Sequence, residues 1–160
     1  MKLLRIILYI GLFGLTTLAQ AQTIIPLERG KGGVRAKNID DYKDEMKMAE
    51  RQRNDSLQYV DHLRRAFNAL HTDSIGQAEL LFNKALKLRP TAPGNHVIKF
   101  NLGLIDMARG QNVEAVKKLT DIIKEYPNYF DARLARAEAN LQLNKANEAV
   151  EDAEQVLNKT

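Results

Sequence analysis

The sequence of 160 residues contains no cysteine and no tryptophan. The absence of cysteine excludes disulfide-stabilised folds, thiol catalysis and thiolate metal sites. Proline (four residues) and glycine (nine residues) are scarce, and aromatic residues make up only 6% of the chain. This composition favours a helical fold in which alanine and leucine pack in layers. It argues against a single core built around large rings.

Motifs that carry chemistry are also missing. The Gly-Lys-Gly-Gly stretch at 30–33 has neither the spacing of a phosphate-binding loop nor a strand leading into it. The basic pairs lack interleaved aromatic residues, which argues against nucleic-acid binding. No two of the histidines are spaced to act as metal ligands on one helical face; they are His62, His71 and His96. We therefore predict no enzymatic activity, no cofactor and no metal site.

The first 21 residues have the pattern of an export signal. Lys2 and Arg5 precede an apolar run over residues 6–18, and Ala19-Gln20-Ala21 supplies small residues at the cleavage positions. The run is shorter than the roughly 20 residues that span a bilayer. We predict a signal peptide over residues 1–21, cut after Ala21, a periplasmic or secreted protein, and no stable membrane span after cleavage. An uncleaved anchor is the alternative.

The chain after the signal changes character twice. Residues 22–39 are basic and rich in glycine, which predicts a flexible leader. Apolar residues then recur every three or four positions from Tyr42 to Leu70, which predicts a helix. The pattern fits one helix from about 40 to 71. It also fits a break near residue 54 that leaves a separate N-terminal helix region over 40–58.

A repeat fills the rest of the chain. The stretch Gly110–Val116 recurs 34 residues later as Asn144–Val150. The preceding copy lies 37 residues upstream, because Pro93-Gly94-Asn95 adds three residues between the first two copies. Three units are predicted, at about 59–92, 96–129 and 130–160. Pro90 and Pro127 are expected to end the second helices of the first two units.

A 34-residue period of helix, tight turn, second helix and closing proline resembles the tetratricopeptide repeat family over residues 59–160. In the second unit the matching positions are Phe100-Asn101-Leu102-Gly103, Gly110, Ala115, Leu119 and Pro127. Arg65 and Arg136 depart from the family by replacing a leucine. Asp73 and Asn144 replace the turn glycine, and both residue types tolerate left-handed geometry. The resemblance implies an all-α solenoid of about three units preceded by an N-terminal helix, and with the predicted signal peptide the chain resembles the exported, bacterial type of this family.

Small residues recur where the two helices of each unit must approach closely. They lie midway along the first helices at Ala66, Gly103 and Ala137, and near the start of the second helices at Ala78, Ala115 and Ala149. Phe82 and Leu119 are expected to fill the wider gap further along. Stacked units of this kind form a superhelix with a concave side.

In this family the first helices line the inner groove. That groove would contain Leu63, Phe67, Leu70, Phe100, Asn101, Leu104, Met107, Leu134, Glu138 and Leu141. A partner's helix or extended segment is the predicted occupant, with ordinary inner-wall packing or a folded-back 40–53 helix as alternatives. Only Asn101 matches the clamp with which one subclass binds acidic chaperone tails, so such binding is not expected.

At the other end, Val150 and Leu157 are positioned to pack on a further hairpin, and the sequence has none to cover them. A frayed end, a homotypic contact or a partner bound at this end is expected there. Together these features predict a non-catalytic protein-binding scaffold of the cell envelope whose partner is a protein or peptide. A self-associating structural protein, or an accessory subunit of an envelope enzyme or transporter, is the alternative.

Overall fold

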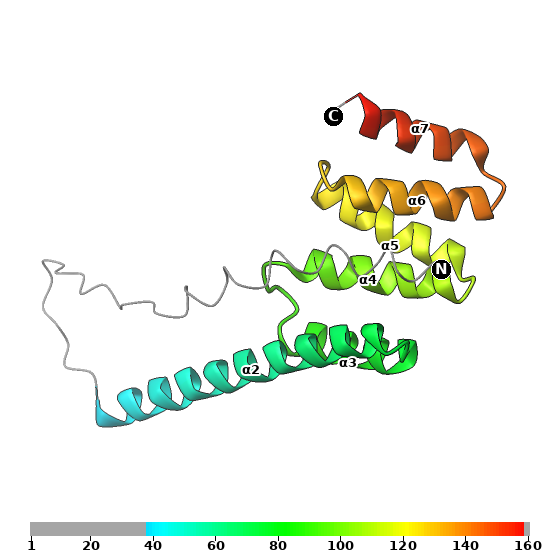
Figure 1. Ribbon diagram of the computed structural model, residues 1–160. Coiled ribbons are helices and arrows are strands. Elements are labelled where there is room, and N and C mark those ends of the chain that lie inside the picture. Colours follow the sequence, from blue (N-terminus) through cyan, green and yellow to red (C-terminus); the bar gives the residue numbers. More distant parts are fainter. Residues whose placement is uncertain (1–37, 159–160) are drawn as a thin grey trace, which may run out of the picture. The chain divides into compact units, whose positions relative to one another are not determined.

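The computed structural model describes residues 38–158, and in that range six α-helices and no strands are present (Figure 1). The helices are α2 (Ile39–His71), α3 (Ile75–Leu88), α4 (Asn95–Ala108), α5 (Asn112–Glu125), α6 (Phe130–Gln142) and α7 (Ala146–Leu157). The predicted signal peptide and most of the predicted leader lie outside the described residues. Of the described residues, 38–47 belong to one unit and 48–158 to a second, which contains the repeats. Within residues 38–158, no helix combines the length and the apolar character needed to cross a membrane.

Helix α2 is continuous through residue 54, where the sequence pattern also allows a break. Ser56, which sits in a stretch able to cap a new helix, instead donates its hydroxyl to the Gln52 carbonyl oxygen at 2.7 Å, inside the helix. No proline or glycine occurs between Ile39 and His71 to interrupt it. The alternative with a break near residue 54 is therefore wrong.

The three hairpins turn in the same way. Asp73, Gly110 and Asn144 occupy equivalent positions and have φ angles of 56°, 77° and 60°. The residue after each of them donates its amide to the carbonyl five positions earlier, at 2.8 to 2.9 Å; the pairs are Ser74–Ala69, Gln111–Asp106 and Lys145–Asn140. This is the hydrogen-bond pattern of a Schellman motif. The prediction that Asp73 and Asn144 replace glycine in left-handed geometry is confirmed.

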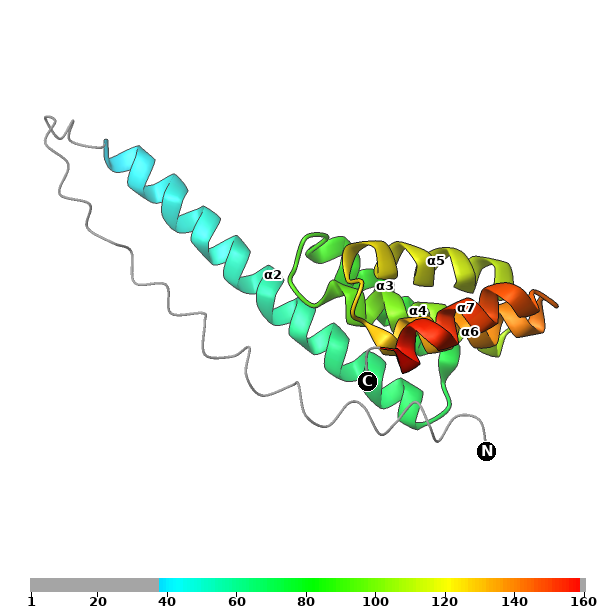
Figure 2. The ribbon, with the colours of Figure 1, turned by 90° about the horizontal axis from the view of Figure 1, so that it is seen from above.

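Two apolar clusters stack the units on one another. The first joins α2, α3 and α4, and the second joins α4, α5 and α6. Helix α4 belongs to both: it gives Ile98, Leu102 and Ile105 to the first cluster, and Phe100, Leu104 and Met107 pack against the second. Consecutive helices from α3 to α7 contact one another along the stack (Figure 1 and Figure 2).

The six small residues predicted at the helix crossings are all buried. The crossing of α4 and α5 is tight, since a Cβ atom added to Gly103 would lie 3.4 Å from the Leu119 side chain. Phe82 and Leu119 are fully buried, as predicted. Helices α3 and α5 end at Leu88 and Glu125, just before Pro90 and Pro127.

Candidate protein-binding surfaces

Nine of the ten predicted groove residues, all but Asn101, lie in three rows, each taking one residue from the first helix of every unit. The rows are Leu63, Phe100, Leu134; Phe67, Leu104, Glu138; and Leu70, Met107, Leu141. Exposure rises along the rows towards the last unit. In the third row, Leu70 is 7% exposed, Met107 is half-buried and Leu141 is 56% exposed. In the first row, Leu63 and Phe100 are half-buried and Leu134 is 49% exposed.

The gradient has a packing cause. The row residues of α2 pack into the first cluster, which α4 closes, and those of α4 pack against the second cluster, to which α6 contributes. Within residues 38–158 no fourth unit follows α7 to cover the row residues of α6. Leu70 and Asn101 are buried, and Asn101 donates its side-chain amide to the Val97 carbonyl oxygen at 2.8 Å. The accessible part of the predicted groove is therefore concentrated on α6, with half-buried edges on α4.

One exposed apolar residue beside the predicted groove was not predicted from the sequence. Val97 is 36% exposed on α4. It precedes Asn101 by four residues and Leu104 by seven, the spacing of one helical face. That spacing was a usable signal. We call Val97, Phe100, Leu104 and Met107 of α4, with Leu134 of α6, the wall.

The last hairpin exposes a second apolar surface. Val150 is 54% exposed and Leu157 is 74% exposed on α7. Their equivalents one unit earlier are Val116, which is half-buried, and Ile123, which is 7% exposed. Their counterparts on α4 and α5 pack together in the second cluster, so by equivalence the exposed residues of α6 and α7 form one surface of the last hairpin. We call this surface the end face; it consists of Leu134, Glu138 and Leu141 on α6 and Val150, Glu154 and Leu157 on α7.

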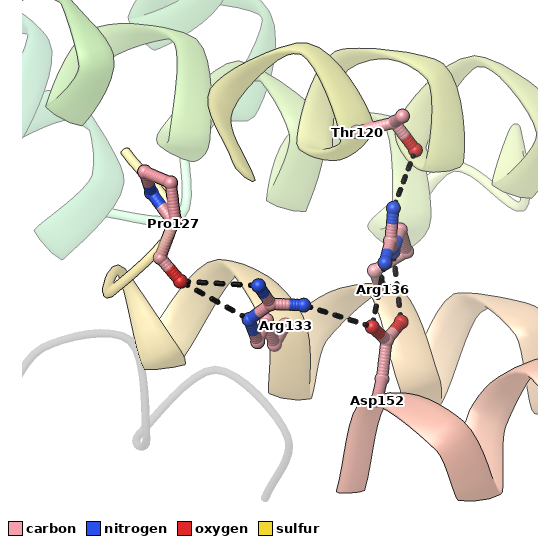
Figure 3. Close-up of polar contacts among 5 residues, drawn as sticks. All are labelled: Thr120, Pro127, Arg133, Arg136 and Asp152. Carbon is pink, nitrogen blue, oxygen red and sulfur yellow. Dashed lines mark hydrogen bonds and ion pairs between the residues drawn. The ribbon is translucent and has the colours of Figure 1, made fainter. Parts of the chain in front are cut away.

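Beneath the end face, α6 and α7 are joined by buried charges (Figure 3). Asp152 is 2% exposed and accepts two hydrogen bonds from Arg136, one from Nε at 2.7 Å and one from Nη2 at 2.6 Å. Arg133 lies 3.7 Å from the same carboxylate and also donates to the Pro127 carbonyl oxygen. Such a two-pronged pair is strong and fixes orientation. The hydrogen bonds that Arg136 donates to Asp152 are the main reason that the pKa of Arg136 is raised.

Arg136 also bridges to the previous unit. Its guanidinium donates to the Thr120 hydroxyl of α5 at 3.0 Å (Figure 3). The position is that of Leu102 in the second unit, where the side chain is buried among apolar neighbours. In the third unit an ion pair replaces that apolar contact, and Ala153 stands where Leu119 fills the second hairpin.

The described residues offer little for chemistry. Among residues 38–158, no group of three or more histidine, aspartate or glutamate side chains is arranged to hold a metal ion. The exposed features are apolar side chains interleaved with single charges. Surfaces of this kind suit the docking of another polypeptide.

Two solved structures are similar to this fold. A tetratricopeptide repeat protein from Parabacteroides merdae ATCC 43184 aligns with a TM-score of 0.62 and 20% identity over 65% of this chain, which spans only 41% of that protein's length. The second tetratricopeptide domain of Spaghetti (RPAP3), bound to the HSP90 peptide SRMEEVD, aligns with a TM-score of 0.58 and 24% identity, covering 71% of this chain and 96% of that domain. No protein-family model and no curated protein matches the sequence. The chain has the all-α solenoid fold of tetratricopeptide repeat proteins, as the sequence predicted.

Proposed function

We propose that this chain is a non-catalytic scaffold of the cell envelope that holds a segment of a partner protein against the wall. The observation that carries the proposal is the apolar character of that surface: Val97 and Leu134 are exposed, and Phe100, Leu104 and Met107 are half-buried beside them. Covering apolar area yields about 25 cal/mol per Å² removed from water. A partner helix or extended segment that carries apolar anchors would gain most from docking there.

The chemistry of the wall argues for an apolar partner segment. The peptide bound by the Spaghetti domain is acidic, and the clamp for such tails needs basic residues and asparagines. Leu63, Phe67, Asp131 and Ala135 stand at the clamp positions here, and none of them attracts a carboxylate. Asn101, the one matching residue, is 5% exposed and already bonded to Val97.

Export to the envelope is part of the proposal and is supported by residues 1–21. Their basic start, apolar run and Ala-Gln-Ala motif are typical of a cleavable signal. Mass determination of the mature chain purified from the envelope fraction would test this: a first residue of Gln22 is expected, and an intact Met1 would contradict it.

The binding proposal is tested by a cross-linked pull-down from the envelope fraction. Val97→Glu and Leu104→Glu place a charge on the wall and are expected to lower the yield of one dominant foreign partner at least about tenfold. Leu80→Glu is the matched control, because Leu80 is 49% exposed on α3, a second helix outside the wall. Circular dichroism confirms that each variant is folded, and Val97→Glu is decisive if Leu104→Glu unfolds. Equal retention of the partner by Val97→Glu and Leu80→Glu, or capture of nothing but the chain itself, would refute the proposal.

A further inference from the structure

The first two hairpins are each closed by the first helix of the next unit. Helix α4 closes the α2–α3 hairpin with Ile98, Leu102 and Ile105, which are spaced by four and three residues. Helix α6 lies on the α4–α5 hairpin with Ala132 and Ala139 at the first and last of these positions and Arg136 between them. The end face is the equivalent surface of the third hairpin. Its geometry therefore fits a helix that carries a stripe of the same spacing.

A second copy of this chain fits the end face poorly. In a head-to-tail contact its α2 helix would supply the stripe, and the equivalent positions there are Asp61, Arg65 and Asn68. A two-fold contact between end faces would instead bring Glu138 and Glu154 of both copies into one interface, with no cation of the end face to pair them. Asp61 already pairs with Arg64 at 2.6 Å and with Arg65 at 3.6 Å. Polar groups would have to lose water and these partners to cover Leu141 and Leu157, which is unfavourable.

The charge of the end face identifies the helix that fits. Across the previous junction, Arg136 at the middle of the stripe donates to Thr120 of α5. The residue of α7 equivalent to Thr120 is Glu154, and Glu138 on α6 stands where the second unit has Leu104. Both glutamates are exposed, and neither forms an ion pair with any residue of 38–158. A basic residue at the middle of an incoming stripe would meet Glu154.

We propose that the end face binds a basic amphipathic helix of a partner protein, with apolar residues at the two ends of its stripe and arginine or lysine at the middle. The helix occupies the place of a next repeat and completes the stack. Apolar residues of the incoming helix cover Leu141, Val150 and Leu157, and the cation at the middle of its stripe pairs with Glu154. Glu138 attracts basic residues that flank the stripe. The inference rests on the proposed role in protein binding, but the deciding residues lie on α7, outside the wall.

Two synthetic helices test it. Each has the 14-residue length of α4, is stapled on its outer side, and carries leucine at both ends of the stripe. One has arginine at the middle and lysine flanks, and the other has glutamate at all of those positions. Fluorescence anisotropy with the full chain is expected to give a dissociation constant at least about tenfold lower for the basic peptide. Glu154→Gln is expected to reduce that preference about threefold or more, whereas Glu114→Gln, an exposed glutamate at the start of α5, leaves it unchanged.

The apolar part of the surface has its own control. Val150→Ser and Leu157→Ser are each expected to raise the dissociation constant of the basic peptide at least about fivefold, because each removes apolar area from the docking surface. Val113→Ser makes the same change at a valine that is 63% exposed on α5, and is expected to have no effect. Thermal melts establish that the variants are folded; all the altered side chains are exposed.

Several results would overturn the inference. Equal affinity for the two peptides would contradict the proposed pairing with Glu154. Undiminished peptide binding by Val150→Ser and Leu157→Ser would show that the peptide does not bind at the end face. If light scattering detects a dimer and Val150→Ser abolishes it, the end face is covered by a second copy of this chain. Loss of the peptide in Val97→Glu together with full binding by Leu157→Ser moves the site to the wall, which refutes this inference and leaves the proposed function standing. Conversely, a pull-down indifferent to Val97→Glu counts against the proposed wall and leaves the peptide result intact.

Discussion

Tyr59 and Asn95 tie the first helix of the first unit to the loop that breaks the 34-residue period. The Tyr59 hydroxyl donates to Asn95 Oδ1 at 2.9 Å, and Asn95 Nδ2 donates to the carbonyl oxygens of Arg89 and Pro90 at 2.8 and 3.0 Å. Asn95 is 5% exposed. Its side chain thus satisfies the backbone where the three extra residues 93–95 enter, and the insertion leaves the stacking of α4 on α3 intact.

Loss of this hydrogen bond is expected to destabilise the protein. Tyr59→Phe removes the donor and leaves Asn95 Oδ1 buried without it, so the free energy of unfolding should fall by about 1 to 2 kcal/mol. Urea denaturation of the wild type, Tyr59→Phe, Asn95→Ala and the double variant measures the coupling between the two side chains. A coupling of about 1 kcal/mol is expected for residues in direct contact. Strict additivity would contradict the bond.

The regular parts of the fold follow from local rules that the sequence displays. Asp73 and Asn144 were predicted to take left-handed turns because they stand where the second unit has Gly110, and short polar side chains tolerate that conformation. Continuity of α2 was left open, since Ser56 serves equally as a cap and as an interior residue. The choice depends on the bond from Ser56 to Gln52, which a sequence pattern does not specify.

The third unit was harder to predict. Arg136 was recognised as a departure from leucine, but its partner Asp152 lies 16 residues away on another helix. Helical spacing rules reach three or four residues and do not connect such positions. The exposure of Leu134 and Leu141 likewise depends on the neighbour of α6, a property of the stack rather than of the helix.

The pair of Arg136 and Asp152 predicts a local stability effect. Asp152→Asn keeps the shape of the side chain but leaves two arginines facing a neutral group, which should destabilise the last hairpin by about 2 to 3 kcal/mol. Hydrogen exchange should rise in α7, while α4 and α5 keep their protection. Asp121→Asn is the matched control, because Asp121 pairs with Lys124 at 3.8 Å on the surface of α5; a change below about 0.5 kcal/mol is expected there. Equal effects of the two variants would show that burial of the pair contributes nothing.

His96 predicts a dependence of stability on pH. Its ring lies 4.3 Å from the Tyr126 ring and 5.5 Å from the Tyr129 ring, and its Nδ1 atom is buried. Burial lowers the pKa of His96 below 6.5, with Lys99 acting in the same direction and Glu125 in the opposite one. The unfolded chain therefore binds the proton first, so the stabilising contribution of neutral His96 is present above pH 6.5 and declines as the pH falls through its folded pKa.

Urea titrations between pH 7.5 and 5 measure this dependence. The free energy of unfolding should fall less steeply towards pH 5 in His96→Phe, which keeps an aromatic ring against Tyr126 and Tyr129, than in the wild type. His71→Phe serves as the control, because His71 is exposed at the end of α2. A wild-type slope preserved in His96→Phe would assign the acid sensitivity to other groups.

Gly110 allows the cost of the left-handed turn to be measured within one protein. Its φ is 77°, and a Cβ atom added there would have no atom within 4 Å, so the penalty of a side chain is purely conformational. Gly110→Ala should lower the free energy of unfolding by about 1 to 2 kcal/mol. Gly110→Asn should cost about half as much, because the chain itself uses asparagine at the equivalent Asn144. Gly76→Ala provides the opposite sign: Gly76 is the second residue of α3, where its added Cβ would meet only Arg109 at 3.9 Å, and alanine should stabilise the helix by up to about 0.5 kcal/mol. Alanine tolerated equally at both sites would mean that the second turn does not hold its left-handed geometry in solution.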